Sequence, residues 1–281
     1  MNVINENEWE TVNGIPMRKG MTITTAFNDS VQDGLIALEE ESWWFEYRAT
    51  VVKTMLDRYM DKNSLIWDVG AGNGYTTLFI QKRGYHVATL EPSYEACKNA
   101  RTRGVKNVHC GTLDPDGIND GSLESIMVLD VIEHIEDDRG FIRLMYDKLA
   151  PNSYALITVP AFMSLWSSND VDAFHFRRYT IPELSGLCQE AGFTVVYDNY
   201  FMRFCYFPII IVRILLVKLG LLHKVGDKTE KESKFVTKLE FGEKIGLLGR
   251  LLRSFEKREL NHIRRGKKIP YGSSLIMVVK K

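Results

Sequence analysis

The stretch LIWDVGAGNGYT, residues 65–76, decides the fold of this 281-residue chain. Its first five residues, Leu65–Val69, are mostly apolar and predict a short strand, and three glycines follow at alternate positions. Glycine lets the backbone turn sharply and approach a ligand closely, because no Cβ intervenes. A helix is predicted next, over Tyr75–Lys82, and the N–H groups at its start favour an anionic or electron-rich group.

A second strand is predicted over His86–Leu90, and Glu91 and Pro92 follow it. An acidic side chain at the end of this strand can accept hydrogen bonds from both hydroxyls of a ribose. Because parallel strands end at the same edge of a sheet, Glu91 and the glycine turn are expected to lie together. The sequence therefore predicts a site for a nucleoside cofactor.

The spacing of Gly70, Gly72 and Gly74 distinguishes between cofactors. In the dinucleotide fingerprint G-x-G-x-x-G, a third glycine would stand where this chain has Tyr75. Asp68 lies two positions before the first glycine, which completes the pattern D-x-G-x-G-x-G. That pattern resembles the class I methyltransferases that use S-adenosylmethionine. The resemblance implies an enzyme of this class with S-adenosylmethionine as its cofactor.

Apolar strands and amphipathic helices alternate through the middle of the chain, which predicts an α/β fold with a Rossmann-like, doubly wound sheet. Further strands are expected at 107–110, 125–129, 155–159 and 193–197, and further helices at 94–103, 137–149 and 181–191. In the resembling family the sheet has seven strands, and the last runs antiparallel to its neighbours. Here that last strand is expected at 273–280.

This arrangement divides the chain into three parts. Residues 1–40 form an N-terminal helical arm, residues 41–201 with 271–281 form the methyltransferase domain, and residues 202–270 form an insertion. A structureless loop of that length would be unusual, so the insertion is expected to contain helices, at 204–222 and 238–263. The first is apolar, but Arg213, Lys218 and Pro208 argue against a membrane-spanning segment. Burial in a dimer interface, contact with a membrane surface and packing in the core all stay open.

The charge distribution and the composition indicate where in the cell the protein acts and what it contacts. The net charge is zero, yet residues 202–281 hold 19 Lys and Arg against 7 Asp and Glu. This excess predicts contact with an anionic membrane surface, unless the two regions neutralise each other within the fold or a homodimer. The polar N-terminus does not resemble a signal peptide, and the four cysteines are scattered, so we expect a cytoplasmic protein, with peripheral attachment to the inner face of the membrane left open. Neither a metal site nor a nucleic-acid partner is expected.

The resemblance implies particular roles within the cofactor site. The backbone around the first two glycines would hold the amino acid end of the cofactor, and the tip of the fourth strand would face its methyl group. The segment after the third strand would bind adenine, and an arginine on the N-terminal helix would pair with the cofactor carboxylate. The residues expected to bind the cofactor are Arg48, Asp68, Gly70, Ala71, Gly72, Gly74, Glu91, Pro92, Thr112, Leu113, Asp130 and Val131.

A second segment, WSSNDVDAFHFRRYT at 166–180, resembles the D-x-x-x-x-H-x-R-R-Y loop of methyltransferases that often act on envelope glycans, glycolipids or other anionic acceptors. His175 paired with Asp170 is the first candidate for a general base, and His134 either joins them in catalysis or ties its loop to a neighbouring backbone. The residues expected to contact the substrate are Trp44, Arg177, Arg178 and Tyr179. Alternatively, the two arginines pin the loop to the acidic segment 136–138.

Three functions are compatible with these patterns. The first is an O- or N-methyltransferase acting on an envelope glycan, a lipid-linked acceptor or another anionic small molecule. The second is a nicotinamide-dependent oxidoreductase, against which the glycine spacing argues. The third is a non-catalytic relative that binds the cofactor or a partner as a scaffold.

Overall fold

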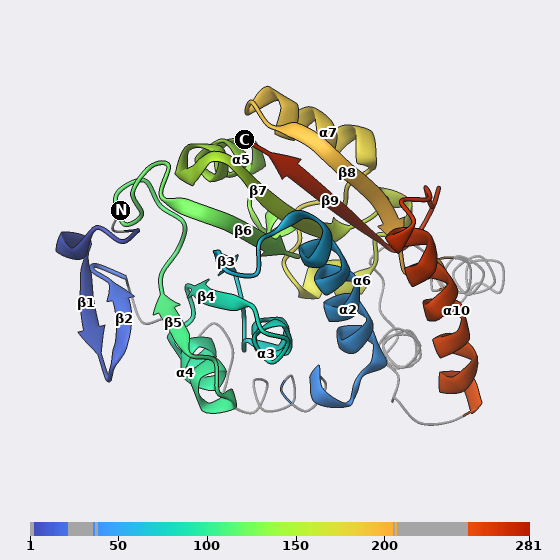
Figure 1. Cartoon of the computed structure of the whole chain (residues 1–281), viewed down its shortest axis with the longest axis horizontal. Coiled ribbons are helices and arrows are strands. Elements are labelled where there is room, and N and C mark those ends of the chain that lie inside the picture. Colours follow the sequence, from blue (N-terminus) through green and yellow to red (C-terminus); the bar gives the residue numbers. More distant parts are fainter. Residues whose placement is uncertain (1–2, 22–35, 37–38, 205, 207–246) are drawn as a thin grey trace.

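The computed structural model describes residues 3–21, 36, 39–204, 206 and 247–281. Its centre is a nine-stranded mixed sheet with the order β1-β2-β5-β4-β3-β6-β7-β9-β8 (Figure 1). The strands are β1 (Trp9–Val12), β2 (Ile15–Arg18), β3 (Leu65–Val69), β4 (His86–Glu91), β5 (Asn107–Cys110), β6 (Leu123–Leu129), β7 (Leu149–Pro160), β8 (Thr194–Phe201) and β9 (Ser274–Lys280). The helices are α2 (Trp43–Tyr59), α3 (Tyr75–Gln81), α4 (Tyr94–Arg103), α5 (Asp138–Lys148), α6 (Ser168–Asp172), α7 (Ile181–Glu190) and α10 (Leu247–Arg264), with 3-10 turns at Glu6–Glu8, Ile132–His134 and Met163–Leu165.

Seven neighbouring strands of the sheet, in the order β5-β4-β3-β6-β7-β9-β8, confirm the predicted fold class. Strands β5, β4, β3, β6 and β7 pair in parallel, and β9 inserts antiparallel between β7 and β8. The order reverses at β3, where β4 lies on one side and β6 on the other. In a doubly wound sheet this reversal opens a crevice at the carboxyl ends of the strands. The glycine turn leaves β3 at that point.

The prediction of a helical N-terminal arm was wrong for residues 9–18, which form strands, whereas residues 36, 39 and 40 are helical. Strands β1 and β2 form a hairpin, and β2 extends the sheet by pairing with β5 at Met17 and Cys110 (Figure 1). The turn is Asn13-Gly14, with φ of 49° and 76°. A two-residue hairpin turn of this kind needs positive φ at both positions, which Asn-Gly tolerates best. The sequence therefore carried the signal for the hairpin. Residues 22–35 and 37–38 lie outside the described part of the arm.

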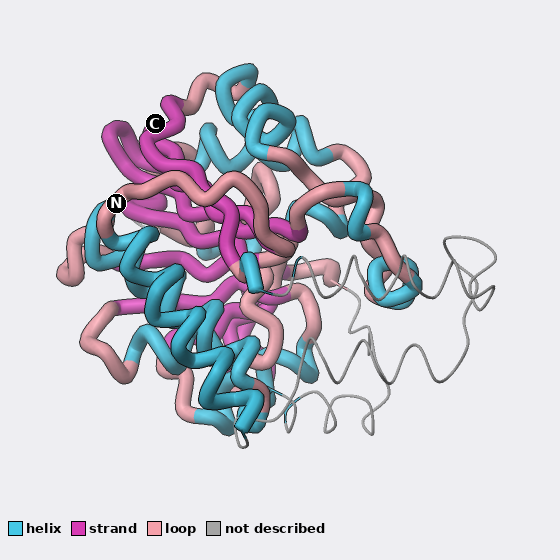
Figure 2. The backbone as a smooth tube through the Cα atoms, turned by 90° about the vertical axis from the view of Figure 1, so that its right-hand side faces the viewer, coloured by secondary structure: helices cyan, strands magenta, loops and turns pink. Residues whose placement is uncertain are grey.

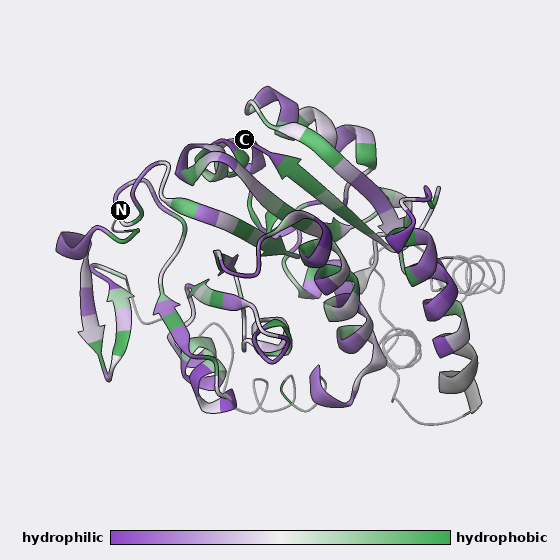
Figure 3. Cartoon of the chain, viewed as in Figure 1, coloured by the Kyte–Doolittle hydropathy of each residue, from purple (hydrophilic) through white to green (hydrophobic). Residues whose placement is uncertain are grey.

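Helices cover both faces of the sheet, and alternate residues of the strands point to opposite layers (Figure 2). On β9, Leu275, Met277 and Val279 pack in the core cluster that holds α5 and α7. Ile276 and Val278 belong to the other cluster, with α2. The central strands are consequently apolar along most of their length, as Figure 3 shows for β6, β7 and β9.

Helix α10, near the end of the predicted insertion, packs against the methyltransferase domain through Glu259. Its Glu259 is 1% exposed and accepts hydrogen bonds from the Tyr47 hydroxyl at 2.6 Å and from the backbone N–H groups of Met202 and Arg203 at 2.7 and 2.9 Å. One carboxylate thus joins α10, α2 and the end of β8. The helix expected at 204–222 lies outside the described residues except at 204 and 206. Among the described helices, none has the length and apolar character that crossing a membrane requires.

Replacing Glu259 tests this junction. We expect Glu259→Ala to lower the free energy of unfolding by about 2–4 kcal/mol, because the Tyr47 hydroxyl and two backbone N–H groups lose their acceptor. Urea unfolding followed by circular dichroism measures the change. Lys257→Ala is the control, since Lys257 is exposed on the same helix and should shift stability by less than about 0.5 kcal/mol. Equal stability of the two variants would contradict this role of Glu259.

Candidate functional site

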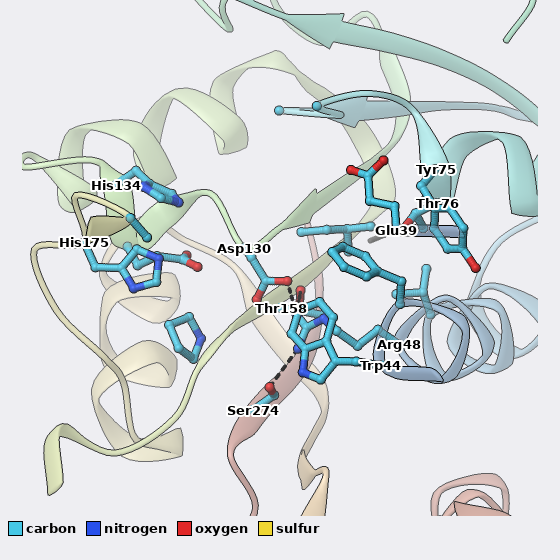
Figure 4. Close-up of a pocket in the computed structure, with 18 of the residues that line it drawn as sticks. Glu39, Trp44, Arg48, Tyr75, Thr76, Asp130, His134, Thr158, His175 and Ser274 are labelled. Carbon is cyan, nitrogen blue, oxygen red and sulfur yellow. Dashed lines mark hydrogen bonds and ion pairs between the residues drawn. The ribbon is translucent and has the colours of Figure 1, made fainter. Parts of the chain in front are cut away.

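A cavity of about 490 Å³ opens at the carboxyl ends of β3, β6 and β7. Figure 4 shows Asp130 near its middle, with His134 and His175 on one side and Tyr75, Thr76 and Glu39 on the other. The side nearest Tyr75 includes the glycine turn after β3, and the opposite side is built by the loop around 169–178. The cavity therefore joins both segments that the sequence singled out.

Two glycines of the turn lie in different surroundings. A Cβ on Gly70 would lie 2.4 Å from the Cγ2 atom of Val131, and φ there is +77°. A Cβ on Gly72 would meet nothing within 4 Å, so this backbone borders open space. The Gly72 N–H donates to Glu91 at 2.9 Å, and the second carboxylate oxygen of Glu91 accepts from the Ser93 N–H at 2.8 Å. Glu91 and the glycine turn thus lie together, as predicted.

Asp68 lies beneath this turn and is 2% exposed. Its Oδ2 accepts a hydrogen bond from the Thr77 hydroxyl at 2.5 Å, and Oδ1 has no partner among the described residues. Burial raises the pKa of the Asp68 carboxyl to about 7. A cationic group bound beside it would favour the charged form, so this position suits an amine.

Arg48 crosses the floor of the cavity and is bonded to three elements. Its guanidinium forms an ion pair with Asp130 and donates to Ser274 Oγ at 2.7 Å and Thr158 Oγ1 at 3.2 Å. Trp44 lies one turn earlier on α2, with its ring centre 4.3 Å from the Arg48 guanidinium carbon. Burial lowers the pKa of Arg48 to about 9. The predicted pairing with a cofactor carboxylate stays a prediction, because the partner here is Asp130.

The opposite side of the cavity is organised by Asp170, which is 1% exposed. Arg178 donates to both of its oxygens, from Nε at 2.7 Å and from Nη2 at 3.0 Å. Asp170 also accepts from the Ser167 N–H at 2.7 Å and bonds His175 Nδ1 at 3.0 Å. Burial alone would raise the pKa of Asp170, but the bonds from His175 and Arg178 outweigh it and hold that pKa well below its usual range. His175 Nε2 is the ring nitrogen that remains for a ligand.

Two neighbouring residues reach this side from the turn after β6. Glu133 is fully buried, and burial raises the pKa of its carboxyl to about 8. The rings of His134 and His175 meet edge to face, with centres 4.6 Å apart. His134 is exposed by its surface area, yet desolvation by the surrounding protein and the neighbouring His175 lower the pKa of His134 to about 4. His134 also bonds the backbone at Ala173 and Phe174, which is the loop contact that the sequence left open.

Several predicted site residues do not line the cavity. Arg177 pairs with Asp138 at 2.6 Å and donates to the Glu136 carbonyl at 2.8 Å, so it pins the loop to the acidic segment, as the alternative interpretation proposed. Tyr179 is 2% exposed and donates its hydroxyl to Asp138 at 2.8 Å. Leu113 is 6% exposed within the core, which leaves little surface for an adenine ring. The cofactor contacts of Pro92, Thr112 and Leu113 stay predictions.

The cavity also contains residues that the sequence analysis missed. Glu133 precedes His134 in the same run after β6, and that adjacency was a usable signal. Thr158 reaches Arg48 from β7, and Ser274 reaches it because β9 pairs with β7, with Pro160 opposite Ser274. No local pattern marks either residue.

The chain matches the family described as a methyltransferase domain over residues 44–198, more than half of its length. It is 26% identical over 161 residues to a "Probable S-adenosylmethionine-dependent methyltransferase" of Mycolicibacterium smegmatis, covering 56% of this chain and 62% of the relative. A protein of the same description from Mycobacterium tuberculosis is 25% identical over 162 residues, covering 57% and 58%. The chain thus spans about three fifths of the length of these relatives.

The fold is also similar to that of a Haemonchus contortus phosphoethanolamine N-methyltransferase 2 solved in complex with S-adenosyl-L-methionine. The TM-score is 0.57 at 14% identity, covering 95% of this chain and 61% of that one. This likeness shows the fold alone. Together with the matched domain, it places the chain in the class I methyltransferase family. S-adenosylmethionine is the cofactor of this class. Asp68 and the glycine turn line the cavity, so an amine fits beside Asp68, whereas Glu91 lies behind the turn and its contact with the ribose stays a prediction.

Glu91 provides the test of cofactor binding. Glu91→Ala should weaken the binding of S-adenosylmethionine by about 1–3 kcal/mol, because ribose hydroxyls and the Gly72 N–H both lose an acceptor. Isothermal titration calorimetry measures this. The control is Glu95→Ala, four residues later on α4, where the carboxylate pairs with Lys98 at the surface. Unchanged affinity in Glu91→Ala would show that ribose binds elsewhere.

Proposed function

We propose that the protein transfers the methyl group of S-adenosylmethionine to an oxygen or nitrogen of a small acceptor. The observation that carries this proposal is the single cavity shared by the glycine turn and the Asp170–His175 pair. A cofactor held by the turn would direct its methyl group towards Asp130, and the acceptor would enter from the side of His175. Positioning the two reactants in line supplies much of the rate in such a transfer.

The sulfonium is an activated electrophile, so the cofactor carries the difficult chemistry. For a hydroxyl acceptor, an oxygen lone pair forms the new bond to the methyl carbon. The electrons of the S–CH₃ bond return to sulfur, which leaves S-adenosylhomocysteine. The proton of the hydroxyl has to leave as well. In the simplest form of the step it passes to His175 Nε2, while Asp170 at Nδ1 stabilises the resulting imidazolium.

His175→Ala tests this side of the cavity. Turnover should fall by about 10²-fold or more if the ring handles the acceptor proton. Affinity for S-adenosylmethionine should stay near that of the wild type, because His175 lies on the other side of Asp130 (Figure 4). Methyl transfer to extracts containing glycan, lipid and quinone fractions gives the readout, with His86→Ala, an exposed histidine, as the control. Retained turnover would refute a chemical role for His175.

The acceptor itself is proposed to have an apolar part and to lie at an anionic surface. Among the described residues, four of the six large apolar side chains that stand exposed lie on the loop that rims the cavity: Met163, Val171, Phe174 and Phe176. Such a patch beside a polar cavity suits a lipid-linked or otherwise amphiphilic acceptor. Exposed cations at Arg264, Arg265 and Lys267 support attachment to an anionic membrane.

Vesicle binding measures this attachment. Binding to phosphatidylserine-containing vesicles should fall steeply as salt rises, since each cation near the surface contributes about 1 kcal/mol and salt screens it. Replacing Arg264, Arg265 and Lys267 with Gln should have the same effect at low salt. The control replaces Lys82, Arg83 and Lys106, which are also exposed, and should leave binding unchanged. If vesicles are ignored while the chain forms dimers, the basic region is an interface between copies instead.

A further inference from the structure

We propose that Glu133, His134 and His175 form a binding site for one divalent transition-metal cation at the acceptor end of the cavity. No metal site was expected from the sequence, because the four cysteines are scattered and form no C-x-x-C pair. The structure brings together one ligand atom from each of these three residues, and all three atoms lie within 4.8 Å of one another. The inference rests on the proposed methyl transfer and changes the role of His175 in it from base to ligand.

The unsatisfied carboxylate of Glu133 is the first support. Its side chain is 0% exposed, its own backbone N–H lies nearby, and neither Oε atom accepts a hydrogen bond from another described residue. Burying a carboxylate without partners is costly, so such groups are usually paired or bind a metal. Glu133 lines the cavity beside the two histidines.

The orientation of His175 is the second support. A histidine that binds a metal through one ring nitrogen commonly bonds a carboxylate through the other. Here Asp170 bonds Nδ1 at 3.0 Å, and Arg178 and Ser167 hold Asp170 in place. Nε2 is left as the ligand atom. This arrangement fixes the direction in which His175 can coordinate before any ion arrives.

The charges around the cluster also allow a cation. Two guanidiniums lie in the cavity, but Arg48 is paired with Asp130, and Arg178 is paired with Asp170. Glu133 is the carboxylate of this group that no cation offsets by direct contact. With an ion of charge two beside Glu133, these two arginines and three carboxylates carry a net positive charge, which suits an acceptor oxygen that becomes negative as it loses its proton.

Two imidazoles and one carboxylate favour Zn²⁺, Mn²⁺ or Fe²⁺ over Mg²⁺ and Ca²⁺, which prefer oxygen ligands. Metal–ligand bonds of about 2.0–2.2 Å require the three side chains to close by roughly 1 Å. Three protein ligands leave a position for the hydroxyl of the acceptor. The cation would lower the pKa of that hydroxyl, whose proton then leaves to water before the oxygen attacks the methyl group.

The experiment measures metal uptake by the full chain without relying on activity. The protein is stripped with a chelator, dialysed, and titrated with Zn²⁺ and Mn²⁺ by calorimetry and elemental analysis. We expect one equivalent per chain. Glu133→Gln and His134→Ala should each weaken binding more than about tenfold, and Asp170→Asn should weaken it by about 10- to 100-fold, because it orients a ligand.

Matched controls separate this cluster from adventitious binding. Glu136→Gln and His262→Ala change the same residue types outside the cluster and should leave the affinity unchanged. Circular dichroism and S-adenosylmethionine affinity report separately on folding and on the cofactor site. Absence of metal uptake by the wild type, or uptake unaffected by Glu133→Gln and His134→Ala, overturns the metal site. The proposed methyl transfer would survive that result, and it fails instead if the wild type binds no S-adenosylmethionine.

Discussion

The buried contact between Arg48 and Asp130 is the constraint on which the cavity depends. Taking a guanidinium out of water is costly unless its charge and hydrogen bonds are satisfied. Arg48 meets that requirement with Asp130 after β6, Thr158 on β7 and Ser274 on β9, 226 positions away. Helix α2 and the last strand, β9, must therefore both be in place before the floor of the cavity exists. Asp130 holds a φ of 56°, an uncommon value for a residue other than glycine.

The opposite side of the cavity is built on a second carboxylate, Asp170. Arg178, His175 and Ser167 all donate to it or bond it, so a loop of irregular backbone presents one imidazole in one direction. The same loop is pinned from outside by Arg177 and Tyr179, which both bond Asp138. The polar residues of this segment therefore have two roles. His175 and Arg178 line the cavity, and Arg177 and Tyr179 hold the loop in place.

The strands and the glycine turn were predictable because their causes are local. Three apolar runs of five residues, followed by Gly70, Glu91 and Asp130, predict the central parallel strands β3, β4 and β6 and place these residues at one edge of the sheet. The hairpin at 9–18 was not predicted, although the dipeptide Asn13-Gly14 is typical of a two-residue hairpin turn. The partners of Arg48 could not have been predicted, because they come from strands whose pairing depends on the closure of the whole sheet. The adjacency of Glu133 and His134 could have been noticed in the sequence, but only the structure shows that the Glu133 carboxylate is buried without a hydrogen-bond partner among the described residues.

By itself, the sequence determined the family, the cofactor class and the edge of the sheet where the cavity lies. The spacing of three glycines constrains the backbone locally, and it argues against a dinucleotide site before any contact is known. The tertiary structure alone decided which charges neutralise one another. Arg178 faces Asp170, Arg177 faces Asp138, and Glu133 is left beside two histidines. These pairings depend on distances of a few ångströms between segments far apart in the chain, and electrostatic energies in a buried site change steeply over such distances.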